Sequence, residues 1–166
     1  MLRALILFNV ILLCACQAKP EQAQRHHNQI MVAQHRVVSA FDQLDSSIYD
    51  STGYRLLYWE YDSVAWHLLQ MTQLLDTIQP LKNDSNLIHS ARAFTTALKA
   101  LHQHEYPLFL DSFRKFSALG QPADSINMCT HQKRIENEKS VIITKLREDQ
   151  NKFVEKYNLT ILDNKE

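Results

Sequence analysis

Apolar residues recur at helical spacing along four long stretches of the chain. Successive apolar positions are mostly three or four residues apart, which is the period of one face of an α-helix, and sustained period-two alternation typical of a strand does not occur. The second stretch is the most regular and ends before Pro80. The positions that define the four stretches are Ile30, Val37, Phe41, Leu44 and Ile48; Leu57, Tyr61, Val64, Leu68, Met71, Leu75 and Ile78; Leu87, Ala91, Phe94, Leu98 and Leu101; and Ile135, Ile142, Leu146, Phe153 and Tyr157.

Residues that favour turns fall between these stretches. Ser51-Thr52-Gly53 separates the first from the second, Asn83-Asp84-Ser85 is suited to cap the third, and Gly120 follows it. Pro107 lies within the third stretch and should either kink that helix or split it in two. Short connections between long helices favour antiparallel neighbours. We therefore predict an all-α, up-and-down antiparallel bundle of four long helices, the third kinked or split at Pro107.

The first fifteen residues have the parts of a secretory signal. Arg3 supplies a positive start, and an almost unbroken apolar run extends from Ala4 to Leu13. A helix of about ten residues rises about 15 Å, half of a hydrocarbon core of about 30 Å, so this run is too short to span a membrane. Such a leader is typical of an export signal that is removed. We expect residues 1–15 to be a signal peptide.

The end of this leader resembles a known processing motif. Leu13-Cys14-Ala15-Cys16 is similar to the lipobox of bacterial lipoprotein precursors. The resemblance implies cleavage before Cys16, a lipid on its sulfur and a membrane anchor, and Gln17 after it implies the outer membrane, with the protein facing the periplasm. The alternative is cleavage after Ala18, which would give a soluble secreted or periplasmic protein.

A single domain is expected behind the leader, because the length of the chain suits one core. Residues 17–28 are mostly polar, so we expect residues 16–28 to form the acylated cysteine and a polar tether. The helical bundle is then predicted over residues 29–157. Residues 158–166 are expected to be a frayed C-terminus.

Charge and cysteine content narrow the possible roles. The chain has 18 basic and 18 acidic residues, so nothing in this balance favours a nucleic acid as partner. Cys14 is lost with the leader and Cys16 is acylated, which leaves Cys129 alone. No disulfide within the chain is then available. Cys129 is interpreted as a small buried hydrophobic residue, and the alternative is a reactive or intermolecular thiol.

Motifs for catalysis and for metal binding are absent from the sequence. The chain has no Gly-x-Ser-x-Gly elbow, no glycine-rich phosphate loop, no His-Glu-x-x-His motif, no Glu-x-x-His pair and no Cys-x-x-Cys-His haem attachment. We therefore predict that the protein is not an enzyme and has no catalytic residues, no metal ligands and no cofactor.

The eight histidines are the remaining source of metal or haem ligands. His26-His27 are adjacent and lie in the expected tether, where neighbouring side chains on a helix point about 100° apart. His102 and His104 are two residues apart and do not share a helix face. A single Met–His haem pair, such as Met71 with His131, is the arrangement that the sequence leaves open.

Trp59 and Trp66 form the most unusual pattern in the second helix. They are seven residues apart and lie together on the side opposite the apolar stripe. One interpretation is that they pack against the first helix, the fourth helix or the segment around Pro107. The other is a contact site for a protein partner, because paired tryptophans are typical of binding hot spots.

These observations predict a membrane-anchored envelope lipoprotein whose bundle is a non-catalytic interaction or scaffolding module. Its expected partners are the membrane, through the lipid, and a protein of unknown identity. The alternative function is a soluble periplasmic bundle that binds a small ligand, haem or a metal. A core filled by Leu, Phe and Ile favours the first function, and an open cavity lined by Tyr, His and Trp favours the second.

Overall fold

Four long helices account for most of the residues that the computed structural model describes, which are 20–49, 54–81, 84–120 and 122–160. Within these ranges no strand occurs, and one isolated bridge joins Leu81 to Asp84 in a connection between helices. The predicted all-α bundle of four helices is therefore confirmed. The helices are α2 (Pro20–Tyr49), α3 (Tyr54–Thr77), α4 (Asn86–Leu119) and α5 (Pro122–Tyr157).

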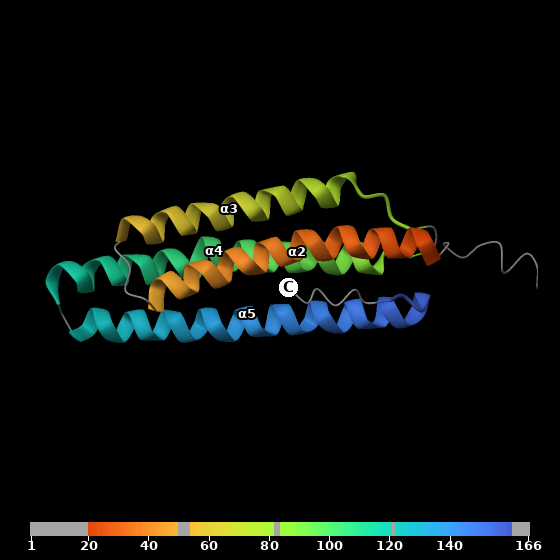
Figure 1. Ribbon diagram of the computed structural model, residues 1–166. Helices are drawn as coiled ribbons and strands as arrows, with labels where there is room; N and C mark the ends of the chain where they lie inside the picture. Colours follow the sequence, from red (N-terminus) through yellow and green to blue (C-terminus); the bar gives the residue numbers. More distant parts are fainter. Residues whose placement is uncertain (1–19, 50–53, 82–83, 121, 161–166) are drawn as a thin grey trace, which may run out of the picture.

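Consecutive helices run in opposite directions and pack side by side (Figure 1). The contact between α4 and α5 is the most extensive, followed by α2 with α3 and α3 with α4, whereas the contact between α2 and α5 is small. The last turn of α4 ends at Gly120, whose left-handed backbone (φ 63°) lets its N–H bond the Phe116 carbonyl at 2.8 Å.

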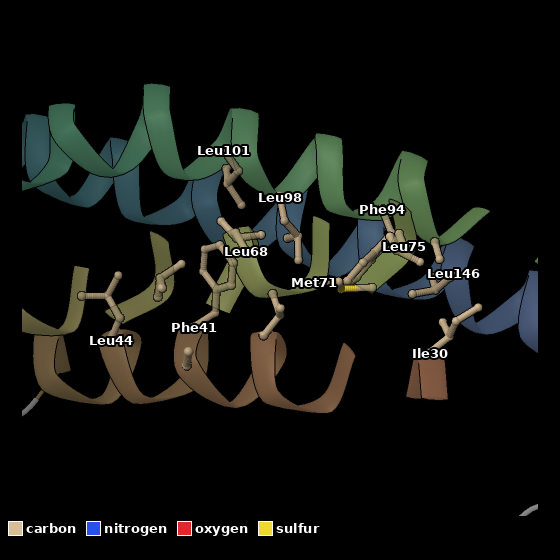
Figure 2. Close-up of a cluster of buried hydrophobic side chains, with 14 of the residues drawn as sticks. Ile30, Phe41, Leu44, Leu68, Met71, Leu75, Phe94, Leu98, Leu101 and Leu146 are labelled. Atoms are coloured by element: carbon tan, nitrogen blue, oxygen red, sulfur yellow. The ribbon is translucent and has the colours of Figure 1, made fainter. Parts of the chain in front are cut away.

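The predicted apolar stripes form the core. Side chains from all four helices meet there, as Figure 2 shows for Ile30 and Phe41 of α2, Met71 of α3, Leu98 of α4 and Leu146 of α5. A small pocket beside the core, between α2, α4 and α5, has a volume of only about 10 Å³. This is room for about one water molecule, so the interior at this place is filled.

Helix α4 continues through Pro107, so of the two predicted outcomes, a kink or a split, the split does not occur. A proline inside a helix removes one backbone hydrogen bond and costs about 3 kcal/mol. Pro107 itself is exposed, but Tyr106, Phe109 and Leu110 on either side of it are almost completely buried. We attribute the continuity of the helix to the burial of these neighbours, which offsets the lost hydrogen bond.

Helix α2 begins earlier than the sequence pattern predicts. Its first residue is Pro20, a residue that favours the first turn because it has no N–H to leave unpaired. Ala23, His27 and Ile30 continue the buried stripe towards this end at helical spacing. Residues 20–28, which we expected in the polar tether, are therefore the first turns of the bundle, and residues 16–19 lie outside the described part of the chain.

The described end of the chain is attached to α2. The side-chain amide of Gln24 donates to the Thr160 carbonyl oxygen at 3.2 Å and accepts from the Thr160 N–H at 3.2 Å. Leu159 packs against the core. Residues 158–160 of the expected frayed C-terminus are thus held in place, and residues 161–166 lie outside the described residues.

Candidate partner-binding site

Trp59 and Trp66 lie on the outer side of α3. The exposed fractions are 65% for Trp59 and 56% for Trp66, and Leu69 one turn further on is also exposed. Trp66 makes an edge contact with the ring of His67, at 4.8 Å between centroids. The interpretation that the two tryptophans pack into the bundle is therefore wrong, and both are available to a partner.

A groove between α2 and α3 lies beside Trp59. We call it the α2–α3 groove. Its first part has a volume of about 460 Å³, and Trp59, Glu60 and His67 of α3 face Arg36 and Gln43 of α2 there. A second part of about 390 Å³ shares Arg36 and continues towards the start of α2, where its lining includes Val32, Ala33 and Leu74.

Glu60 is the unexpected member of this groove. Its side chain is only 6% exposed, and the described residues offer it neither a hydrogen bond nor an ion pair. Its carboxylate oxygens are not fully enclosed, so the group can still be reached from the groove. The spacing contains a signal for this burial, because Glu60 follows Leu57 by three residues and precedes Val64 by four, and both are core positions.

Positive charge lies at the middle of the same groove. Burial and the charge of Arg36 both lower the pKa of His67. Arg36 has no ion pair among the described residues. Arg36 and Gln43 are seven residues apart on α2, which separates them by about 10 Å along the helix axis. The groove therefore has an acidic end beside Trp59 and Gln43 and a basic centre at Arg36.

One cluster of polar groups, on α2, α4 and α5, is paired within itself. Tyr106 is fully buried and donates to an oxygen of Asp45 at 2.7 Å, and Lys139 binds Asp45 and also Asp42, the latter at 3.0 Å. Burial and the negative charge of Asp45 raise the pKa of Tyr106 well above its usual value. Burial by itself would lower the pKa of Lys139, but the two aspartates outweigh it and raise that pKa. This network joins α2, α4 and α5.

A polar hollow of about 300 Å³ lies between the start of α4 and the end of α5. Asp84 closes one side of it and accepts hydrogen bonds from the Asn86 N–H at 3.0 Å, Lys156 at 2.6 Å and the Tyr157 hydroxyl at 3.0 Å. Burial favours a raised pKa for Asp84, but these three donors hold its pKa below the usual value. Within the predicted cap cluster, Asp84 is therefore the residue whose side chain accepts a hydrogen bond from the first N–H of α4.

The other carboxylate of this hollow is also occupied. Asp149 accepts from Ser90 at 2.8 Å and from Lys152 at 3.3 Å. Since the hollow's two lysines, Lys152 and Lys156, each bind a carboxylate there, it offers no unpaired lysine to an anionic ligand.

The histidines lie in separate places. His102 is buried against Tyr61, whereas His104 is exposed. His27 is buried in parallel orientation to Phe153, at 6.3 Å between ring centroids. His131 binds Glu105 at 3.1 Å, and Met71 is enclosed in the core. Among the described residues, no group of three or more His, Cys, Asp or Glu side chains could hold a metal ion.

Two predictions concern cysteines, Cys129 and Cys16. Cys129 is exposed on α5, so the interpretation of a buried hydrophobic residue is wrong. The cause is the wide polar side of α5, on which a single cysteine carries no periodic signal. Cys16, the predicted lipidation site, lies outside the described residues.

Comparison with family models, with curated proteins and with solved structures finds no match for this chain. In the described part of the chain, none of the helices combines the length and the apolar character needed to cross a bilayer.

Proposed function

We propose that this chain is an envelope lipoprotein, anchored through Cys16 to the outer membrane and facing the periplasm, whose helical bundle captures a partner protein. The observation that carries the proposal is the exposure of Trp59 and Trp66 beside the α2–α3 groove. Tryptophan is enriched among residues that dominate binding energy, and exposed apolar patches mark interaction sites. The bundle acts as a non-catalytic interaction module.

The filled interior supports an interaction module over a ligand-binding one. The core side chains are mainly Leu, Ile, Val and Phe, and both tryptophans lie outside it. A cofactor or small ligand held in the core needs a cavity of about 300 Å³ or more there, and the small pocket beside the core is far below this. The hollow of about 300 Å³ between α4 and α5 is polar, and its two lysines are already paired with carboxylates.

The position of the tryptophans favours a protein over the lipid surface as their target. Lipid on Cys16 leaves three residues before Pro20, so the first turn of α2 stays within about 14 Å of the anchor. Arg36, which lines the groove with His67, is 16 residues beyond Pro20 (36 − 20), or about 24 Å along α2. Trp59 lies further still, beside Gln43. Trp59 and the part of the groove beside it therefore lie well away from the anchored end.

The test is photo-crosslinking in intact cells that make the anchored protein, followed by identification of the crosslinked partner. We expect the double variant W59A/W66A to lose the crosslinked species while its helical circular dichroism and melting temperature stay close to those of the parent, because exposed side chains contribute little to folding. The matched control is L119A/I126A. It removes two exposed apolar side chains, one from the end of α4 and one from the start of α5, that do not line the groove. Equal crosslinking by W59A/W66A and the parent would contradict the proposal.

The anchor is tested separately by metabolic labelling with palmitate. Label should enter the parent protein and be lost in C16S, because the sulfur that carries the lipid is then missing. Label that persists in C16S, or that is absent from the parent, would contradict the anchor without bearing on the tryptophan site.

A further inference from the structure

We propose that the partner binds as an amphipathic helix in the α2–α3 groove and places a lysine or arginine side chain on the carboxylate of Glu60, against the ring of Trp59. This inference rests on the proposed function and names the kind of partner that the site accepts. Recognition of a helix by an apolar groove is a common mode of peptide binding, and here charge specifies the register.

The first argument is the state of Glu60. Its side chain is more than nine-tenths buried, it lines the groove, and nothing among the described residues pairs with it. The carboxylate is partly shielded by its surroundings but still reaches the groove, so an arriving cation can form an ion pair there that is less screened than one on the open surface. An ordinary surface glutamate offers no comparable gain.

The second argument is the position of Trp59 next to Glu60. Trp59 lines the same groove and precedes Glu60 in the chain, and 65% of its surface is exposed. The face of an indole attracts cations, and tryptophan is the best of the aromatic residues for this contact. The carboxylate of Glu60 and the indole of Trp59 both line the α2–α3 groove. Together they favour binding of an ammonium or guanidinium group over a neutral or anionic one.

The third argument is the shape of the groove, which favours a helix over a single small amine. The lining of its two parts extends along α2 from Asn28 to Gln43, which is 15 residues and about 22 Å. Val32, Ala33 and Leu74 make one end apolar, and Arg36 lies between the ends without an ion pair. A helix of about 15 residues fits this length, with its basic residue at Glu60, an acidic residue about two turns away at Arg36, and apolar residues beyond.

The experiment is a selection from a displayed library of amphipathic helices about 16 residues long, carried out in parallel on the full chain and on its E60Q and D62N variants. Asp62 is exposed on the same helix, so D62N removes the same charge from a site outside the groove lining and is the matched control. We expect peptides selected on the parent to share a lysine or arginine at one position. Their affinity should fall about ten-fold or more on E60Q and remain within two-fold on D62N.

A second measurement keeps the test independent of how well E60Q folds. In W66F, Trp59 is the single tryptophan of the chain and its fluorescence reports the groove directly. A selected peptide should change this fluorescence at saturation. The same peptide with citrulline in place of arginine, or with norleucine in place of lysine, should bind about ten-fold more weakly to the unmodified protein.

The outcomes separate this inference from the proposed function. Peptides that need Trp59 and Trp66 but bind the parent and E60Q equally, or that share no basic residue, overturn the role of Glu60 and leave the interaction module standing. Failure to select any peptide that depends on the tryptophans overturns the helix-binding groove. If intact-cell crosslinking is then also unchanged in W59A/W66A, the proposed function fails with it.

Discussion

The rings of Tyr61 and His102 are stacked with their centroids 3.9 Å apart, and each side chain hydrogen-bonds to the other residue's main-chain carbonyl oxygen. The Tyr61 hydroxyl donates to the His102 carbonyl at 3.1 Å. Nε2 of His102 lies 2.9 Å from the Tyr61 carbonyl and must carry the hydrogen, because a carbonyl only accepts. The pair fixes the register of α3 against α4, since a shift of either helix would break both bonds.

Removing the Tyr61 hydroxyl should weaken this connection without removing the ring stack. We expect Y61F to lower the free energy of unfolding by about 1 kcal/mol, the usual net value of one such hydrogen bond. H102A removes the stack, one bond and buried volume together, and should cost about 2–4 kcal/mol. Urea unfolding followed by circular dichroism measures both. The exposed His104 gives the control, and an H104A cost equal to that of H102A would contradict the assignment.

Acidification should destabilise the bundle at mildly acidic pH. Burial lowers the pKa of His102 and of His27 relative to the unfolded chain, although the Tyr61 carbonyl partly opposes this at His102. The unfolded state therefore binds more protons than the folded state below about pH 6.5, and the stability present above that pH is lost as the pH falls towards the folded pKa values. We expect the melting temperature to fall between pH 7.5 and pH 5.

The size of this loss should shrink in H102Q, which keeps a donor near the Tyr61 carbonyl but has no titratable group. Asp84 does not contribute in this window, because its pKa is held below its usual value and that group titrates only at lower pH. A melting temperature that is constant or rises from pH 7.5 to pH 5 in the parent protein would contradict the prediction.

The network around Asp45 should be more costly to break on its lysine side than on its tyrosine side. Y106F removes one hydrogen bond to a charged acceptor, worth about 1.5–3 kcal/mol, but leaves Asp45 paired with Lys139. K139M leaves Asp45 without its cation in a site where the carboxylate is mostly buried, which should cost about 3 kcal/mol or more.

Denaturant unfolding of the two single variants and the double variant gives the coupling between Tyr106 and Lys139. Because both side chains bind the same carboxylate, we expect the two costs to be non-additive by about 0.5 kcal/mol or more. Strict additivity would indicate that the two contacts with Asp45 are independent.

Much of the fold follows from local sequence signals. The unbroken three- and four-residue spacing from Leu57 to Ile78 predicts α3 and its buried side, and Gly120 is the cap at which α4 ends. These features are predictable because spacing and backbone preference act within one helix. The helix through Pro107 was less predictable, since its continuity depends on burial against other helices.

The interior polar groups were not predicted, although some of them leave a trace in the spacing. Glu60, His27 and His102 each lie three or four residues from core positions, so they belong to the buried sides of their helices. A count of apolar residues assigns such positions to solvent. Whether a buried polar side chain is paired, as His102 is, or unpaired, as Glu60 is, depends on the helix opposite and cannot be found from one helix alone.

The boundary between anchor and bundle can be tested at Ala23. This residue is completely buried in α2, whereas its neighbour Gln22 is exposed. A23E places an unpaired carboxylate in an apolar site and should lower the free energy of unfolding by at least about 2 kcal/mol, while Q22E adds the same charge at the surface and should change it by less than about 0.5 kcal/mol. If residues 16–28 were a tether outside the bundle, the two substitutions would have the same small effect. Thermal unfolding of the two variants side by side therefore determines whether an anchor at the proposed site, Cys16, would hold the bundle on a long flexible segment or close to the membrane.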